Sequence, residues 1–428
     1  MAKLATAKIP DLARCDIAIV GGGLVGCSLF LALKNSGLQV ALVEAGAQHQ
    51  HLTNVADARH LALNAQSVAT LGALGVSLDL HSASKITQVR INRAGEFGRV
   101  DLKAAEHGLT TFGQLIPAFQ LGAALEAAML EVCAKNPSMQ RIQPARLTDL
   151  QLLTSAAQLT LQTGENSDLI EQILHTQLVI GADGTASAVR QFAGLGAQTK
   201  ARDYQQSALV FNFSGDLSTE GLALERFSDT GPLAVLPLPN RRLGAVWTLP
   251  SERAFALQNA PQQFASAFQN ALGSTFGRVR QLGTPVIWPL QLMQCVPNVG
   301  YRCALIGNAA QTIHPLGAQG FNLGLRDAVH MAEYLTALGD SAECAKQASN
   351  PAFFTEFATA RAPDRDSTIA FSDGLLASTS SPSRLSSLLR SIGLTLLAGN
   401  SLIQRDVIRF GLGFTRSNNL KLVNLLKL

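Results

Sequence analysis

Glycines at residues 21–26 combine with a later acidic residue in a spacing that suits a bound dinucleotide. The segment reads G-G-G-L-V-G, a G-x-G-x-x-G sequence. Gly21 allows a tight turn, Gly23 lets the backbone approach a pyrophosphate, and Gly26 lets a helix pack closely on a strand. Glu44 follows 23 residues after Gly21, where a carboxylate accepts hydrogen bonds from two ribose hydroxyls. Because a carboxylate repels a 2′-phosphate, the segment favours FAD or NAD over NADP.

The residues on either side of this loop have the pattern of a βαβ unit. Asp16–Val20 is a β-branched run that predicts a buried parallel strand, and Val40–Val43 predicts a second one. Between them, apolar residues at helical spacing predict a helix that ends by Gly37. The start of that helix offers unpaired N–H groups to phosphates. A G-x-G-x-x-G alone is weak evidence, but here both strands, the helix and the acidic residue occur in the right order.

Two later segments have the same strand-then-glycine pattern. Gln177–Ile180 predicts a buried strand and leads into G-A-D-G, which contains Asp183. Leu305-Ile306 leads into Gly-Asn at residues 307–308 and then into H-P-L-G-A-Q-G-F-N at residues 314–322. At these segments the chain resembles the FAD-dependent aromatic hydroxylases of the para-hydroxybenzoate hydroxylase fold, which carry an Asp-Gly motif and a Gly-Asp motif. One departure is Asn308, because most of that superfamily has aspartate there.

The resemblance implies a set of cofactor and catalytic residues. His314 and Pro315 are the catalytic candidates beside the flavin, although a histidine before a proline is often structural. Gln114 or Gln120 would contact the FAD; the spacing admits either, and we take Gln120. Arg190 is expected to connect the Asp-Gly loop to flavin, phosphate or nicotinamide. The residues expected to bind FAD are Gly21, Gly23, Gly26, Glu44, Arg59, Gln120, Asp183, Asn308, Gly320 and Asn322.

The order of the patterns predicts how the chain is divided. Strand-like runs between Ile86 and Val100 and between Ala208 and Leu290 lie apart from the βαβ segments and predict a second sheet. The expected fold class is α/β, with a discontinuous Rossmann-like FAD-binding domain, a mixed or antiparallel β-sheet substrate domain and a C-terminal helical region. The FAD-binding segments are 14–85, 113–200 and 291–340, the substrate-domain segments 86–112 and 201–290, and the C-terminal helices 341–428.

Composition excludes several classes of protein. With 47% hydrophobic residues and a net charge of +4 over 428 residues, the chain is not disordered. It has no run of about 18 apolar residues that would span a membrane and no signal peptide, so we expect a cytoplasmic location. The six cysteines form no C-x-x-C pair and predict reduced thiols without a metal site. No sequence typical of nucleic-acid binding occurs.

The end of the chain concentrates positive charge. Residues 384–428 hold seven basic residues and one acidic residue, a net charge of +6, interleaved with leucines at near-helical spacing. A basic, apolar tail suits an anionic membrane surface, which favours peripheral attachment to the inner face of the cytoplasmic membrane. The alternative is a helix that packs on the body of the protein with its arginine stems reaching water.

Within the family, the sequence is most similar to the ubiquinone-biosynthesis branch that hydroxylates 2-polyprenyl-6-methoxyphenols. The residues that carry this likeness include Glu225-Arg226-Phe227 and Gly231–Leu236. The resemblance implies that NAD(P)H reduces FAD, that O₂ forms a flavin C4a-hydroperoxide, and that oxygen passes to a prenylated methoxyphenol, with other ubiquinone-biosynthesis proteins as partners. The alternatives are a prenyl-lipid reductase or epoxidase on the same fold, and a non-catalytic FAD-binding subunit. No tyrosine or histidine stands out in the sequence as the base that would ionise a phenol.

Overall fold

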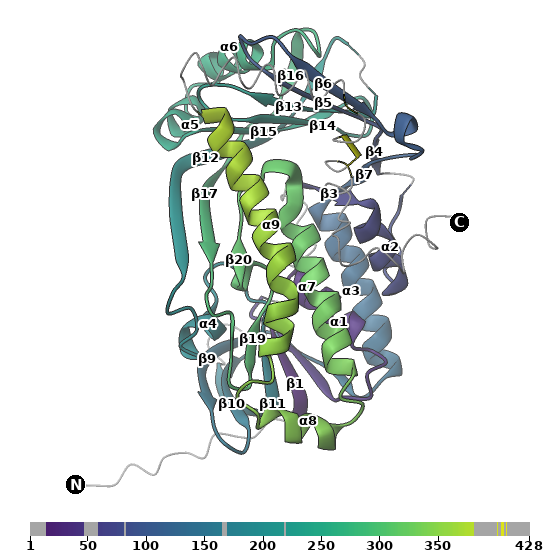
Figure 1. Cartoon of the computed structure of the whole chain (residues 1–428), viewed down its shortest axis with the longest axis vertical. Helices are drawn as coiled ribbons and strands as arrows, with labels where there is room; N and C mark the ends of the chain where they lie inside the picture. The colour runs from purple at the N-terminus through teal and green to yellow at the C-terminus, as the bar shows by residue number, and fades with distance from the viewer. Residues whose placement is uncertain are drawn as a thin grey trace, which may run out of the picture.

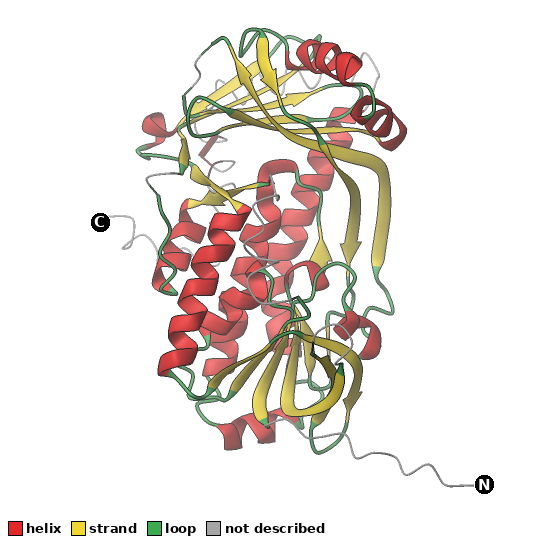
Figure 2. Cartoon of the chain, turned by 180° about the vertical axis from the view of Figure 1, so that it is seen from behind, coloured by secondary structure: helices red, strands yellow, loops and turns green. Residues whose placement is uncertain are grey.

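The computed structural model describes residues 14–46, 59–80, 83–164, 169–217 and 220–380, together with residues 400, 404, 405 and 408. In this part of the chain two large sheets lie at opposite ends of the molecule, and long helices run beside and between them (Figure 1). The view from behind shows the same division, with the N-terminal sheet at the lower end and the second sheet at the upper end (Figure 2).

The lower sheet is built around parallel strands: β1 (Cys15–Val20), β2 (Val40–Val43), β8 (Met139–Ile142), β11 (Ile170–Gly181) and β19 (Cys303–Leu305). Their spatial order is β19, β11, β1, β2, β8. One side of β1 carries the strand that follows it in the chain, and the other side carries β11, which comes much later. A ligand binds at such a switch point, outside the carboxyl ends of the strands.

Both faces of these strands are covered, which explains their continuous apolar runs. Leucines of three helices pack on one face with Ile17 and Ile19, while Ala18 and Val20 face a layer of antiparallel strands. The three helices are α1 (Leu24–Ala32), α3 (Ala118–Lys135) and α7 (Gln319–Thr336). The antiparallel layer is β9 (Ala145–Leu152) and β10 (Ala157–Thr163), and β18 (Val299–Gly300) pairs with β19 at the edge.

The second sheet has the spatial order β20, β17, β12, β15, β14, β13, β5, β6, with β16 also paired to β12. Its outer face packs on α5 and α6 through buried aromatic rings that include Phe211, Trp247 and Phe268. The bounds are β5 Gln88–Arg93, β6 Arg99–Lys103, β12 Lys200–Gly215, β13 Leu222–Phe227, β14 Leu233–Pro237, β15 Leu243–Pro250, β16 Val279–Leu282, β17 Val286–Gln294, β20 Gln311–Thr312, α5 Ser251–Gln258 and α6 Pro261–Leu272.

A small third sheet connects the two large ones. It consists of β3 (His60–Asn64), β4 (Ser84–Ile86) and β7 (Gly113–Pro117) in the order β3, β7, β4. Its Leu115 packs with Ala223 of the second sheet. The remaining helices are α2 Ala65–Ala73, α4 Ala188–Phe192, α8 Ser341–Ala348 and α9 Thr355–Ser380, and the 3₁₀ turns are η1 Ala104–His107, η2 Gly307–Ala309 and η3 Leu316–Ala318.

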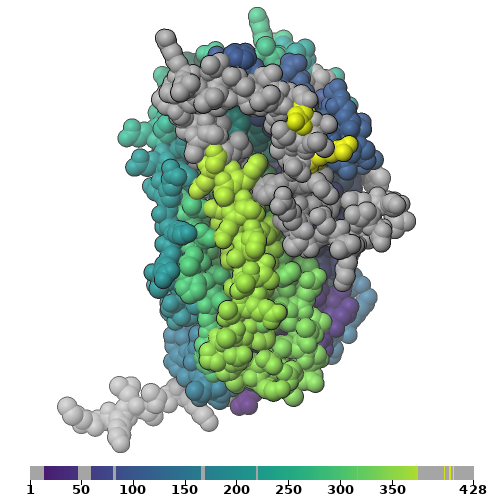
Figure 3. Space-filling view, in the orientation of Figure 1, coloured from purple at the N-terminus to yellow at the C-terminus, as the bar shows by residue number. Residues whose placement is uncertain are grey.

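The predicted fold class is confirmed, because a parallel α/β unit is combined with a mixed sheet and C-terminal helices. Helix α9 lies along the front of the molecule, from the lower end toward the second sheet (Figure 3). Among the described helices, none is long and apolar enough to cross a membrane. Most of the basic tail lies outside the described residues, but Ile408 is buried beside Val100 and Leu102 of the second sheet.

Candidate functional site

The glycine-rich segments meet at one edge of the lower sheet. Because β19, β11, β1 and β2 are parallel neighbours, Asn308, Asp183, Gly21 and Glu44 all follow the carboxyl ends of adjacent strands. The sequence spreads these positions over almost 300 residues, and the sheet order brings them to one edge of the sheet, at the switch point beside β1. We call this edge the crevice, after the place where ligands bind such sheets. This is the arrangement that an extended dinucleotide requires.

The G-x-G-x-x-G loop has the geometry expected of a pyrophosphate cradle. Gly21 has a φ of +107°, and an added Cβ there would lie 2.5 Å from the carbonyl oxygen of Ala182. An added Cβ at Gly26 would lie 1.9 Å from the carbonyl oxygen of Gly21, so only glycine allows α1 this close to the strand end. At Gly23, by contrast, an added Cβ meets no described atom within 4 Å. That open space beside the start of α1 fits a pyrophosphate.

The Glu44 carboxylate is held at the end of β2 by backbone donors. Its Oε2 accepts a hydrogen bond from the Gly22 N–H at 2.6 Å, and its Oε1 accepts one from the Gly46 N–H at 2.6 Å. The side chain is half-buried. Since two N–H groups fix its orientation, the carboxylate is pre-organised to receive the ribose hydroxyls of an adenosine.

Asp183 and Arg190 organise the loop after β11. The Asp183 Oδ2 accepts a hydrogen bond from the Val189 N–H at 3.1 Å, while its Oδ1 is buried without a hydrogen-bond partner among the described residues. An orphaned carboxylate oxygen in the crevice fits a hydroxyl donor from a cofactor. Arg190 donates to the carbonyl oxygens of Thr185 at 2.7 Å and Ala309 at 3.0 Å. In the structure it therefore connects the two late loops to each other.

The loop after β19 presents Asn308 to solvent. Gly307 has a φ of +56° and lies against Val25. A Cβ added at Gly307 would be 3.1 Å from the Val25 side chain. The turn leaves Asn308 exposed while its neighbours are buried. An amide side chain has an oxygen that can accept a hydrogen bond from a hydroxyl group and a nitrogen that can donate one, and it carries no negative charge.

Helix α7 begins at the same crevice with an open first turn. Ala318 precedes it with a φ of +52°, and no described side chain caps the helix. At Gly320, in the first turn, an added Cβ meets nothing within 4 Å. The first-turn N–H groups, which have no acceptor within the helix and no side-chain cap among the described residues, lie with the positive end of the helix dipole at this end of α7.

Asn322 holds this helix end in place. Its Nδ2 donates to the carbonyl oxygens of Ala62 and Ala318, each at 2.9 Å. Its Oδ1 accepts from the Ser67 hydroxyl at 2.7 Å and from the Asn64 N–H at 3.2 Å. The side chain that we expected to bind FAD thus bonds protein groups on four sides. Two of its hydrogen-bond partners, Asn64 and Ser67, carry no local sequence signal for this role.

His314 is buried at the base of the loop before α7, and Pro315 beside it is exposed. The imidazole is 1% exposed and packs edge-on against the ring of Tyr204, with ring centroids 5.3 Å apart. The Tyr204 hydroxyl donates to Asp373 of α9. Burial lowers the pKa of His314 to about 4, although the charge of Asp373 opposes the shift. His314 is therefore neutral at physiological pH.

The buried neutral imidazole predicts a loss of stability in acid. In the unfolded chain the pKa of His314 returns to about 6.5, so the unfolded state binds the proton first as the pH falls. We expect about 3 kcal/mol of stability to be lost between pH 6.5 and pH 4. Denaturant unfolding of wild type and H314Q across this range measures the effect. The free energy of unfolding of H314Q should depend less on pH than that of wild type. Equal dependence on pH in the two proteins would contradict a buried, neutral His314.

The remaining predicted contacts lie at the border between the sheets. The Arg59 guanidinium lies over the ring of Trp288 in β17, 4.9 Å from its centroid, and so reaches the second sheet. Gln120 is half-buried in the first turn of α3. Gln114 in β7, the alternative to Gln120, has a buried Oε1 without a hydrogen-bond partner among the described residues. This oxygen could accept a hydrogen bond from a ligand.

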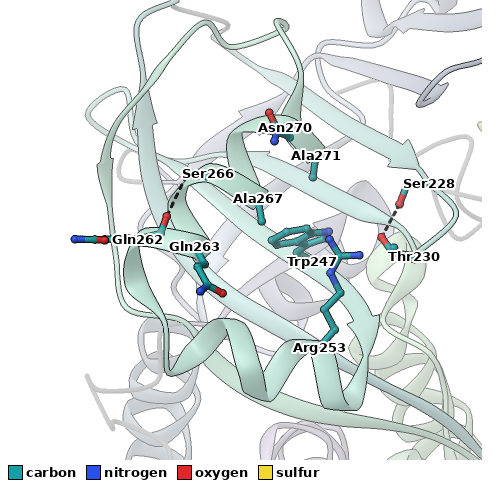
Figure 4. A pocket seen from close by; sticks show the side chains of 10 residues that line it. All are labelled: Ser228, Thr230, Trp247, Arg253, Gln262, Gln263, Ser266, Ala267, Asn270 and Ala271. Atoms are coloured by element: carbon teal, nitrogen blue, oxygen red, sulfur yellow. Dashed lines mark hydrogen bonds between the residues drawn. The ribbon is translucent and has the colours of Figure 1, made fainter.

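A separate pocket opens on the outer side of the second sheet. Figure 4 shows Arg253 beside Trp247 there, with polar side chains of α6 around them. The lining contains no group that carries out redox chemistry, and it lies on the α6 side of the sheet, with the aromatic rings of the outer face. We therefore place the functional site in the crevice of the lower sheet.

Known proteins share this sequence pattern and this architecture. The profile of the FAD binding domain family matches residues 14–344. Ubiquinone hydroxylase UbiL of Rhodospirillum rubrum is 30% identical over 400 residues, covering 93% of this chain and 89% of that protein. The 3-demethoxyubiquinol 3-hydroxylase of Escherichia coli is 30% identical over 316 residues, covering 73% and 77%. The structure of p-nitrophenol 4-monooxygenase PnpA of Pseudomonas putida matches in fold, with a TM-score of 0.74 and 16% identity over 95% of this chain and all of that one.

Proposed function

Because the chain belongs to the FAD binding domain family, we propose that it is a flavin-dependent monooxygenase that hydroxylates a prenylated methoxyphenol in ubiquinone biosynthesis, with NAD(P)H and O₂ as co-substrates. Its relatives named above, a ubiquinone hydroxylase and a demethoxyubiquinol hydroxylase, support this class of substrate. When FAD is bound, it supplies hydride transfer from NAD(P)H and the activation of O₂.

The observation that carries the proposal is the convergence of four strand ends and the open start of α7 on one crevice. The loop from Gly21 to Gly26 would hold the pyrophosphate and Glu44 the adenosine ribose. Asp183 and Asn308 would hold hydroxyls of the ribityl chain on the flavin side of the pyrophosphate. The N-terminus of α7 would lie at the polar edge of the isoalloxazine, where its dipole stabilises negative charge on the reduced ring.

The second sheet would provide the substrate side of the site. The Arg59 guanidinium lies over the Trp288 ring, so a residue that we expect to contact FAD reaches the second sheet. Val286 and Trp288 of β17 are 42% and 41% exposed. Apolar side chains that stay accessible in this place suit a prenylated ring, and they exclude water from it once it is bound.

Product mass tests the proposed reaction. The full-length protein, loaded with FAD and supplied with NADPH or NADH and air, should convert a prenylated methoxyphenol to a product that is one oxygen atom heavier. A product that is two hydrogens heavier would identify a reductase instead. FAD binding without NAD(P)H oxidation, with or without the phenol, would identify a non-catalytic subunit.

We also propose that the basic tail attaches the enzyme to the inner face of the cytoplasmic membrane, where its lipid substrate resides. Truncation after residue 383 removes a net charge of +6 and should weaken binding to anionic vesicles about tenfold or more. Co-sedimentation with phosphatidylglycerol vesicles measures this, and flavin fluorescence measures FAD binding in parallel. Ile408 of the tail packs on the second sheet. If truncation weakens vesicle binding and FAD binding equally, the tail has a purely structural role.

A further inference from the structure

One row of residues crosses the second sheet on the face opposite α5 and α6. Cross-strand pairing places Ile91, Glu225, Ala234, Val246 and Val210 side by side, from β5 through β13, β14 and β15 to β12. All five residues are partly exposed, whereas neighbours of four of them on the outer face are buried with aromatic rings: Leu224, Val235, Ala245 and Phe211. The row is therefore an accessible apolar surface that contains a single carboxyl group.

This face is turned toward the proposed flavin site. Side chains alternate along a strand, so Glu225 shares a face with Ala223, two residues before it. Ala223 packs with Leu115 and, at its margin, Ala62 of the small sheet. The carbonyl oxygen of Ala62 accepts the hydrogen bond from Asn322 that holds the start of α7. The carboxyl group thus lies on the side of the sheet that meets the cofactor-binding lobe.

No described group neutralises Glu225. Its neighbour Arg226 points to the opposite face, where it donates to the carbonyl oxygen of Ala271 at 2.9 Å and to Asn92 at 3.1 Å. Arg93, the next residue of β5 on the same face after Ile91, is paired with Glu96 at 2.9 Å and with Asp229. The Oε2 of Glu225 is buried and has no hydrogen-bond partner among the described residues.

Burial alone raises the pKa of Glu225 to about 7. The neighbours across the strands, Ile91 and Ala234, are apolar and contribute no charge. A carboxyl group with this environment destabilises the folded protein above neutral pH, when it is ionised. Such a cost is typical of a residue retained for its chemistry.

We propose that Glu225 contacts the substrate and accepts the proton of its phenolic hydroxyl. This inference rests on the proposed function. The phenolic O–H bond breaks, the proton moves to a carboxylate oxygen of Glu225, and the electron pair stays on the phenolic oxygen. The resulting phenolate enriches the ring in electrons at the carbon that takes up oxygen, and the carboxyl group returns its proton to water after turnover. The apolar row beside Glu225 would hold the ring and the start of its prenyl chain.

Stability measurements separate this role from a structural one without any assay of turnover. E225Q removes the buried charge, so its unfolding temperature should exceed that of wild type at pH 8 and match it at pH 5. E252Q makes the same chemical change at an exposed site on α5 and should leave both values unchanged. A lower unfolding temperature for E225Q at pH 8 would mean that the carboxylate stabilises the fold and would overturn the proposal.

The pH dependence of hydroxylation provides the second test. In wild type, kcat/KM for a prenylated methoxyphenol should rise through pH 7 as Glu225 ionises. In FAD-loaded E225Q, kcat/KM should be about 100-fold lower and should not rise through pH 7. E225D should restore part of the rate and part of the rise with pH. If wild type hydroxylates the phenol and E225Q has the same kcat/KM and the same pH dependence, the role of Glu225 is wrong and the proposed function stands. If wild type itself hydroxylates no prenylated phenol, the proposed function fails with it.

Discussion

Replacing Gly23 with valine is expected to weaken FAD binding about 100-fold while leaving the apoprotein folded. Gly23 has a φ of −69° and a ψ of 179°, a conformation that valine adopts readily. Its added Cβ would meet no described protein atom within 4 Å, so the fold has room for the side chain. The same space is where a pyrophosphate would approach the start of α1, and the isopropyl group would fill it.

Fluorescence titration of FAD into the apoprotein measures the affinity of G23V, and its thermal unfolding measures the fold. G72V is the matched control, because Gly72 in α2 also has open space at its Cβ and lies outside the crevice. The control should bind FAD like wild type. Unchanged FAD affinity in G23V would contradict the placement of the pyrophosphate.

Asp327→Ala is expected to reduce the free energy of unfolding by about 3 kcal/mol, because it removes one of the two carboxylates that pair with buried Arg361 and leaves two buried donors without an acceptor. The Oδ1 of Asp327 accepts from Arg361 at 2.9 Å, and its Oδ2 accepts from Gln311 at 2.6 Å. Arg361 also contacts Asp364 at 2.6 Å, and Asp364 accepts two hydrogen bonds from Arg326. This network joins α9 to α7, the helix whose first turn faces the flavin site.

Urea unfolding of the apoprotein measures this loss. Asp366 of α9 is exposed, and the hydrogen bond that it accepts from Gln294 at 2.8 Å is also exposed, so D366A should change stability by less than about 1 kcal/mol. FAD affinity of D327A, measured where the variant is still folded, should fall as well, since α9 holds α7 in position. Equal stability of the two variants would show that the network contributes nothing.

The sequence predicts that the strand ends carrying four of the candidate residues lie at one edge of a sheet, for a physical reason. Parallel strands align their carboxyl ends, so Gly21, Glu44, Asp183 and Asn308 had to meet once their strands were recognised. Each of these residues also has a local signal, because it is a glycine or a polar residue within three residues of the end of an apolar run. The order of strands in the sheet, however, follows from pairing that no local pattern specifies.

The residues that depend on long-range pairing could not be predicted in this way. Asn322 meets Ser67 and Asn64, which lie 255 and 258 residues earlier in the chain, so its role in fixing α7 appears only in the folded protein. Arg190 joins the loops after β11 and β19 through two backbone carbonyl groups, and no local sequence pattern specifies these partners. Glu225 had one usable signal, an acid within the apolar strand L-A-L-E-R-F, but only the sheet register reveals the face on which it lies.

The origin of the inserted oxygen tests the central claim most directly. The FAD-loaded protein is incubated with NAD(P)H, a prenylated methoxyphenol and ¹⁸O₂ in ordinary water, and the product is analysed by mass spectrometry. A flavin monooxygenase predicts a new hydroxyl group that carries one ¹⁸O atom. A product without ¹⁸O, or one in which the oxygen derives from labelled water in the reciprocal experiment, would contradict the account.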